Sequence, residues 1–238
     1  MNVPVWCVEL AAAFWAKAGP PPPFPRDLRT AVTAVPLSVV EMNGVSVAGV
    51  RDWFARIELP VPLNEPDRPL RACLVAWRGE GFAFLDARDD PAERAFSLAH
   101  ELAHFLRDYL RPREAVTGRL GRASLEVLDG LRPATPAERL HAVLRGLALG
   151  PFAHLMRRDE SGRPLTPAER EAEAAADRLA FELLAPVGAV GSARPRAELT
   201  ERLVRAFGLP PGPAARYAAL LVPDPPHIDR GLARLFER

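Results

Sequence analysis

The sequence predicts an α+β protein that is mostly helical, with a small antiparallel sheet packed on a central helix. Two observations lead to this class. Apolar runs at 71–78 and 82–86 flank a turn, Gly79-Glu80-Gly81, and this pattern predicts a β-hairpin. Elsewhere, apolar or amphipathic stretches begin at capping residues and end at Gly or Pro, which is typical of helices.

The composition is that of an ordinary soluble globular protein. The 238 residues are 48% hydrophobic and 26% charged, and the formal net charge is +1. This balance gives no bulk electrostatic basis for binding nucleic acid or an anionic membrane. Because Cys7 and Cys73 are the only cysteines, a four-cysteine zinc site is excluded and a disulfide framework is not expected. The N-terminus has no basic leader and no stretch is long enough to span a membrane, so we expect a cytoplasmic protein.

Residues 1–66 are predicted to form an N-terminal helical segment with a Pro-rich connector. The stretch 3–18 is apolar with few charges and is expected to be a helix that ends at Gly19 and the proline run after it. A second helix is expected at 26–34.

The stretch 37–54 has the outline of a helix-turn-helix. Asn43-Gly44 is a turn signal, and Ser46 is placed to cap the helix that follows. Such an outline is compatible with DNA binding, but its second helix offers little polar surface to base edges or phosphates. We favour a packing or substrate-wall element and expect no direct nucleic-acid binding.

Two long helices follow the predicted hairpin. The first begins at Asp90 as N-cap with Pro91 at its first position, and Pro112 is expected to close it. The second covers 167–184, capped by Thr166. Between them the chain is broken by Gly and Pro, and shorter helices are predicted near 123–130 and 136–148.

The chain is organised around His100-Glu101-x-x-His104, within the apolar stretch 96–106. In a helix, positions four apart lie about 40° apart around the axis and about 6 Å apart along it. Both imidazoles can therefore reach one metal ion. Glu101 falls beside the pair. It is suited to accept a proton from a water molecule on that metal, and not to bind the metal itself.

The competing interpretation is a helix with two incidental histidines. The chain has only five histidines, so two at this spacing around a glutamate would be a sizeable coincidence. The helix is also apolar on both sides of the motif, where unpaired imidazole and carboxylate groups would be costly to bury. We favour the metal site, provided that a third ligand lies elsewhere.

Glu173 is the predicted third ligand. It lies four positions before Asp177 in the 167–184 helix, so both can face the histidines, and Asp177 can accept the free N–H of one of them. Glu171 points about 200° away from Glu173 and cannot share the site. Taken alone, Glu173 would be a solvated charge, but the alanines at 174–176 leave room for close helix packing.

Four weaker candidates also fit packed or solvated residues. Their possible roles are a further hydrogen-bond acceptor, an oxyanion stabiliser and a transition-state hydrogen-bond donor. In that order they are Asp108, then His154, then Tyr109 and Tyr217.

Together these motifs resemble the ImmA/IrrE family of zinc-dependent metallopeptidases. The family pattern is a hairpin, an Ala-His-Glu-Leu-Gly-His helix, a Glu-x-x-Ala-Asn/Asp helix and a Leu-Leu-x-Pro exit. The corresponding segments here are 99–104, 173–177 and 183–186. The chain departs from the pattern at Ala103, which replaces the usual glycine, and at Asp108, where many members have a further histidine.

The resemblance also implies a domain organisation. A zincin-like metallopeptidase domain is expected at 67–190, and the spacing between its two motifs exceeds the usual one, so about 111–165 looks like a helical insertion. A C-terminal helical tail follows at 191–238, where such domains often carry a small helical pair.

The resemblance implies zinc bound by His100, His104 and Glu173, with Glu101 as the catalytic base. Two histidines and a carboxylate also suit Mn²⁺ or Fe²⁺. The implied function is an endopeptidase that cleaves a helix-turn-helix repressor of a stress-response or mobile-element operon. Two alternatives remain open at this point. One is a catalytically weak or inactive metal-binding module that acts through protein contacts, and the other is a hydrolase of a non-peptide substrate.

Overall fold

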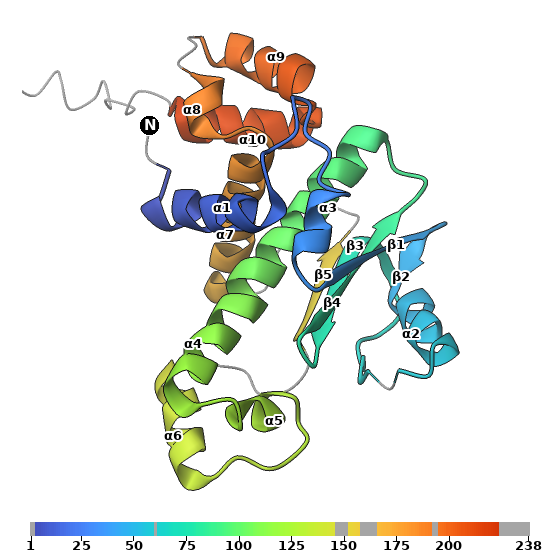
Figure 1. Ribbon diagram of the computed structural model, residues 1–238. Helices are drawn as coiled ribbons and strands as arrows, with labels where there is room; N and C mark the ends of the chain where they lie inside the picture. Colours follow the sequence, from blue (N-terminus) through green and yellow to red (C-terminus); the bar gives the residue numbers. More distant parts are fainter. Residues whose placement is uncertain (1–2, 60, 146–151, 158–165, 192–194, 224–238) are drawn as a thin grey trace, which may run out of the picture.

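The computed structural model describes residues 3–59, 61–145, 152–157, 166–191 and 195–223 (Figure 1). Its central element is a long continuous helical rod. The rod consists of α3 (Pro91–His104), the π-helical turn η2 (Phe105–Leu110) and α4 (Arg111–Leu120). The sheet lies on one side of this rod, while α1 (Val5–Ala18) and α7 (Pro167–Leu184) lie on the other (Figure 1).

The prediction that Pro112 closes the motif helix is wrong. The rod passes through this residue, which occupies the first turn of α4 directly after the π turn. A missing N–H is tolerated in a first turn, so the proline does not end the rod. π turns of this kind are frequent near functional sites.

The sheet contains five described strands, β1 (Leu37–Met42), β2 (Val45–Ser46), β3 (Pro69–Trp77), β4 (Glu80–Asp86) and β5 (Phe152–Arg157). The predicted hairpin is confirmed as β3 and β4, paired in antiparallel register. β5 pairs with β3 along its other edge, also antiparallel.

The predicted α+β class, mostly helical with a small sheet on the motif helix, is confirmed, but the sheet is not antiparallel throughout, because β1 runs parallel to β4. The sheet is therefore mixed. The chain passes through β2 and α2 (Val47–Arg56) before it returns as β3 and β4, so β1 and β4 are not hairpin partners and need not be antiparallel.

The two faces of the sheet are covered by different helices. On β3, Ala72, Leu74 and Ala76 belong to the core shared with α3, whereas Cys73 and Val75 belong to a second core shared with α2. This alternation is the period-2 pattern of a strand buried on both faces. It presses one face of the sheet onto the helix that carries the histidine motif.

The helix-turn-helix outline at 37–54 is also wrong in its first half, where the chain forms β1. Its second half is confirmed: the Ser46 hydroxyl accepts a hydrogen bond from the Gly49 N–H at 3.1 Å and caps α2. The helix predicted at 26–34 reduces to one short turn, η1 (Ala31–Ala34).

The stretch 111–165 is not wholly helical. It contains α4, α5 (Ser124–Leu128) and α6 (Pro136–Arg145), and then β5 completes the sheet. The helix expected to reach residue 148 is described only to 145. The prediction of a helical insertion is therefore corrected by a strand that belongs to the central sheet.

The C-terminal helices share one core with the rest of the protein. They are α8 (Val187–Val190), α9 (Arg196–Phe207) and α10 (Pro211–Leu221). Tyr217 stacks on Phe181 of α7 with ring centroids 4.4 Å apart, and its hydroxyl donates to the Ala185 carbonyl. α1 contributes to the same core. The domain limits at 66 and 190 stay predictions.

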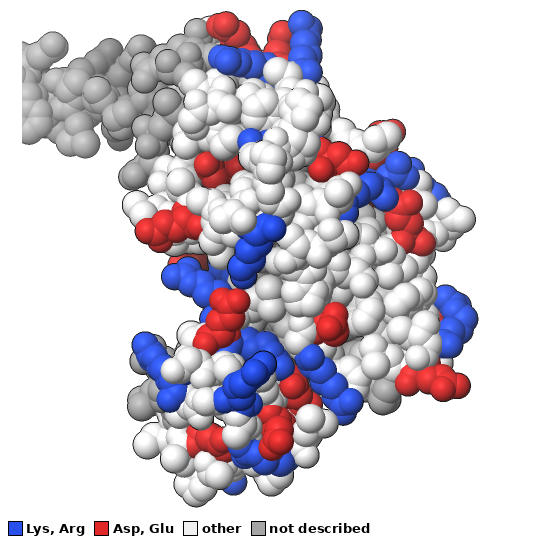
Figure 2. Space-filling model, in the orientation of Figure 1, with Lys and Arg blue, Asp and Glu red and all other residues white. Residues whose placement is uncertain are grey.

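Acidic and basic side chains alternate on the face in Figure 2, and neither sign gathers into a single field. This agrees with the net charge of +1. No helix in the described part of the chain has the length and apolar character needed to cross a membrane.

Candidate metal centre

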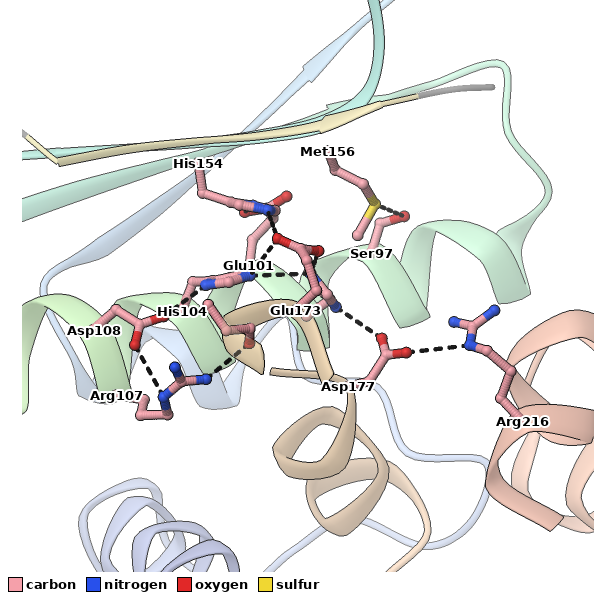
Figure 3. A network of polar contacts seen from close by, with 12 residues as sticks. Ser97, Glu101, His104, Arg107, Asp108, His154, Met156, Glu173, Asp177 and Arg216 are labelled. Atoms are coloured by element: carbon pink, nitrogen blue, oxygen red, sulfur yellow. Dashed lines mark hydrogen bonds and ion pairs between the residues drawn. The ribbon is translucent and has the colours of Figure 1, made fainter. Parts of the chain in front are cut away.

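Four side chains from three elements converge beside α3. His100 and His104 come from α3, His154 from β5 and Glu173 from α7 (Figure 3). One potential ligand atom of each lies within 4.8 Å of the others. The structure thus brings together the three predicted ligands and adds a histidine that sequence reasoning placed only among the weaker candidates.

The distances among the predicted ligands suit one ion. His100 Nε2 lies 3.1 Å from His104 Nε2 and 3.3 Å from Glu173 Oε2. His104 Nε2 lies 3.7 Å from Glu173 Oε1. Ligand atoms at about 2.0–2.1 Å from a tetrahedral ion are roughly 3.3 Å apart. The three side chains could therefore hold a metal ion without a change of fold.

In each histidine of α3, the ring nitrogen that faces away from the site, Nδ1, forms a hydrogen bond with a carboxylate. His100 Nδ1 donates to Asp177 Oδ1 at 3.0 Å, and His104 Nδ1 donates to Asp108 Oδ2 at 2.7 Å. A proton on Nδ1 leaves the lone pair of Nε2 directed at the site, which is the tautomer that a metal needs.

An arginine supports each of these carboxylates. Arg216 Nε of α10 donates to Asp177 Oδ2 at 3.1 Å, and Arg107 Nε lies 2.9 Å from Asp108 Oδ1 (Figure 3). Arg107 also donates to the Ala172 carbonyl of α7 at 2.8 Å. The orientation of the histidines is therefore fixed by α7, by the π turn and by the C-terminal helices.

Glu101 is fully buried beside the cluster. Its Oε2 accepts a hydrogen bond from His154 Nδ1 at 2.8 Å. Its Oε1 is buried and has no hydrogen-bond partner among the described residues. A buried carboxylate oxygen without a partner is costly, and a carboxylate joined to the cluster through His154 suits a proton acceptor for a water molecule in the site. By this measure the residues fit a metal.

A comparison with protein families agrees with this geometry. Residues 73–125 match the family model described as the IrrE N-terminal-like domain. This match supports membership of the ImmA/IrrE family. The matched part of this IrrE-like domain includes His100, Glu101 and His104, whereas His154 and Glu173 lie beyond it. The family is one of metallopeptidases. Neither the curated proteins nor the solved structures yielded a match.

The electrostatics of the IrrE-like site favour the protonation states that bind a cation at two of the ligands. Burial, with His154 and His100 nearby, lowers the pKa of His104 well below its ordinary value. Burial raises the pKa of Glu173, but His100 and His154 outweigh burial and hold that pKa far below the ordinary value. A neutral imidazole and an ionised carboxylate are the forms that coordinate metals.

His100 and His154 carry raised pKa values in the same site. Burial lowers the pKa of His100, but hydrogen bonds with Asp177 and Glu173 outweigh it and raise the pKa to about 9. Burial likewise lowers the pKa of His154, and the carboxylates of Glu101 and Glu173 raise it to about 10. A metal ion that binds His100 must displace its proton.

The two tyrosines have other contacts in the IrrE-like domain and its C-terminal helices. The Tyr109 hydroxyl accepts the Gly79 N–H at 2.7 Å in the β3–β4 turn. The Tyr217 hydroxyl donates to Ala185 at 3.1 Å. The Tyr217 proton is therefore used within the C-terminal core, and the Tyr109 oxygen is held at the β3–β4 turn.

Proposed function

We propose that the protein is a zinc-dependent endopeptidase. The observation that carries the proposal is the tetrahedral spacing of three candidate ligand atoms, together with the buried carboxylate of Glu101, which His154 joins to the cluster and which has one oxygen without a partner among the described residues. His100, His104 and Glu173 would hold the metal. Zinc would supply Lewis acidity, which polarises the scissile carbonyl and makes water a stronger nucleophile at neutral pH.

The remaining chemistry belongs to the protein's own residues. Glu101 Oε1 accepts a proton from the attacking water and later delivers it to the leaving amine. Asp177 and Asp108 keep the two histidines in the tautomer that presents Nε2 to the site. Because Glu101 is fully buried, its charge acts in a medium of low dielectric constant, where it is felt strongly by a reacting water.

We further propose that the substrate is a protein, namely a helix-turn-helix repressor in a stress-response or mobile-element operon, cleaved in the cytoplasm. The support is the match to an IrrE N-terminal-like domain, and the mixed charge on the face in Figure 2 offers no basic field there for nucleic acid.

The test compares wild type with Glu101→Gln and, as matched control, Glu171→Gln. Glu171 is an exposed glutamate of α7 two positions from Glu173. Each variant is co-expressed with the product of an adjacent repressor gene, and its metal content is measured by elemental analysis. We expect zinc in all three proteins, and site-specific cleavage by wild type and the control only.

Equal cleavage by wild type and Glu101→Gln would overturn the peptidase mechanism. Zinc without cleavage in every protein, with repression still relieved, would instead favour a metal-binding regulatory module. Manganese or iron in place of zinc would change the metal but leave the role of Glu101 standing.

A further inference from the structure

His154 reaches the candidate site from a part of the chain that the family match does not include. It lies on β5, opposite Leu74 of β3, whereas the matched segment ends at residue 125. Phe152 and Met156 of β5 pack on the core shared with α3, while Leu155 packs on the opposite core. The strand alternation therefore directs His154 at α3.

The two ring nitrogens of His154 touch two different functional carboxylates. Nδ1 lies 2.8 Å from Oε2 of Glu101, and Nε2 lies 2.7 Å from Oε1 of Glu173 (Figure 3). Carboxylates accept hydrogen bonds, so both nitrogens donate. One side chain thus joins the candidate base on α3 to the candidate ligand on α7.

His154 could alternatively be a fourth ligand, but its ring geometry argues against this. Its ring stacks on that of His104 with centroids 3.8 Å apart and an interplanar angle of 23°. Two imidazoles bound to one tetrahedral ion have centroids roughly 5 Å apart, because their lone pairs must converge. The His100–His104 pair, at 4.8 Å and 65°, meets that requirement, and the His104–His154 pair does not.

We propose that His154 is a positioning residue that holds Glu101 by Oε2 and so directs Oε1 at the reacting water. This rests on the proposed function, in which Glu101 is the base. A carboxylate held at one oxygen cannot turn that oxygen toward the site, so the other is presented in one orientation. The second hydrogen bond, to Glu173, keeps the carboxylate of that ligand from rotating away from the two histidines.

Asparagine and glutamine separate the two hydrogen bonds. The amide nitrogen of asparagine takes about the place of imidazole Nδ1, and that of glutamine takes about the place of Nε2. His154→Asn therefore keeps the donor to Glu101, His154→Gln keeps the donor to Glu173, and His154→Ala removes both. Met156→Leu is the matched control, because this residue lies on the same face of β5 and the change conserves volume.

Three measurements are made on the zinc-loaded full-length variants. Zinc affinity is obtained by competition with a chromophoric chelator, and kcat and KM are obtained with the purified product of the adjacent repressor gene. The histidine ring N–H signals are recorded by NMR after ¹⁵N-histidine labelling. We expect His154→Gln to lose about 10–100-fold in kcat with zinc affinity near wild type. We expect His154→Asn to keep kcat and lose about 10-fold in zinc affinity. His154→Ala loses both, and Met156→Leu neither.

In the NMR spectrum of wild type we expect a ring N–H signal that His154→Ala removes and Glu101→Gln shifts. The proposal is overturned if Glu101→Gln leaves that signal in place, or if the Asn and Gln variants are equally impaired in kcat. Failure of the peptidase function has a different signature. Repressor cleavage would then be absent or unaffected by Glu101→Gln, while the ring N–H signal would still report the contact between His154 and Glu101.

Discussion

Replacing Asp177 with alanine should weaken zinc binding by about 10–100-fold, or about 1.4–2.8 kcal/mol. Asp177 accepts from His100 Nδ1 at 3.0 Å and from Arg216 Nε at 3.1 Å, and its side chain is only 21% exposed. A hydrogen bond to a charged group contributes about 1.5–3 kcal/mol, which agrees with the range for partners of metal ligands. Without Asp177, His100 loses the acceptor that fixes its tautomer.

The assay is competition with a chromophoric chelator at pH 7, with circular dichroism to confirm folding. Asp177→Asn retains an oxygen acceptor and should lose less than Asp177→Ala. Asp108→Ala removes the equivalent contact at His104 and should fall in the same range. Arg216→Ala should lose only a few-fold, because the arginine is 53% exposed and its ion pair is partly screened by solvent.

Unchanged zinc affinity in both Asp177→Ala and Asp108→Ala would refute the argument that these carboxylates orient the ligands. A loss in Asp177→Ala that is matched by an equal loss of thermal stability in the metal-free protein would assign Asp177 to the fold instead. The two results separate because zinc affinity and metal-free stability are measured independently.

Three further predictions concern the framework of the site. Burial raises the pKa of Glu182 in the folded protein. Its carboxyl therefore destabilises the folded state once the pH rises above the ordinary pKa of a glutamate, because ionisation is then easier in the unfolded chain. Glu182→Gln should raise the thermal midpoint more at pH 8 than at pH 4. Gly81→Ala would put a Cβ 2.6 Å from Phe105 Cε2 and should lower the free energy of unfolding in urea by about 1–3 kcal/mol. Arg113→Met leaves Asp129 without its bidentate partner at 2.7 and 2.8 Å and should cost about 3 kcal/mol, most of which a second change, Asp129→Leu, should recover.

The parts of the fold that follow local rules were predictable. The β3–β4 hairpin, the Ser46 cap and the capping box at Thr166 and Glu169 each depend on residues a few positions apart. β1 was not predicted as a strand, and its direction was not predictable either, because its partner lies about forty residues away and either direction satisfies backbone hydrogen bonds. The prediction that Pro112 ends the helix was wrong because the π turn before it has no clear sequence signal.

The candidate ligands were predictable because helical periodicity relates them in pairs. His100 and His104 are four positions apart, as are Glu173 and Asp177. His154 has no such partner, and its stretch is as apolar as a core strand. The available signal was the alternation of Phe152, His154 and Met156, which puts the histidine on one face of a strand. This alternation places His154 at the site only once it is known that β5 pairs with β3.

The helical period also explains why a site whose candidate ligands come from two helices, α3 and α7, also involves a strand, β5. Successive residues of α3 differ by about 100°, so Glu101 faces a different direction from the histidines on either side of it. The histidines turn their outward nitrogens to Asp177 of α7 and Asp108 of the π turn, while Glu101 turns to β5. The candidate ligands are therefore oriented by helical elements, and the candidate base is oriented by the sheet. The motif pair on α3 and α7 can specify where a metal binds, but the direction in which Glu101 presents its free oxygen depends on the strand that carries His154.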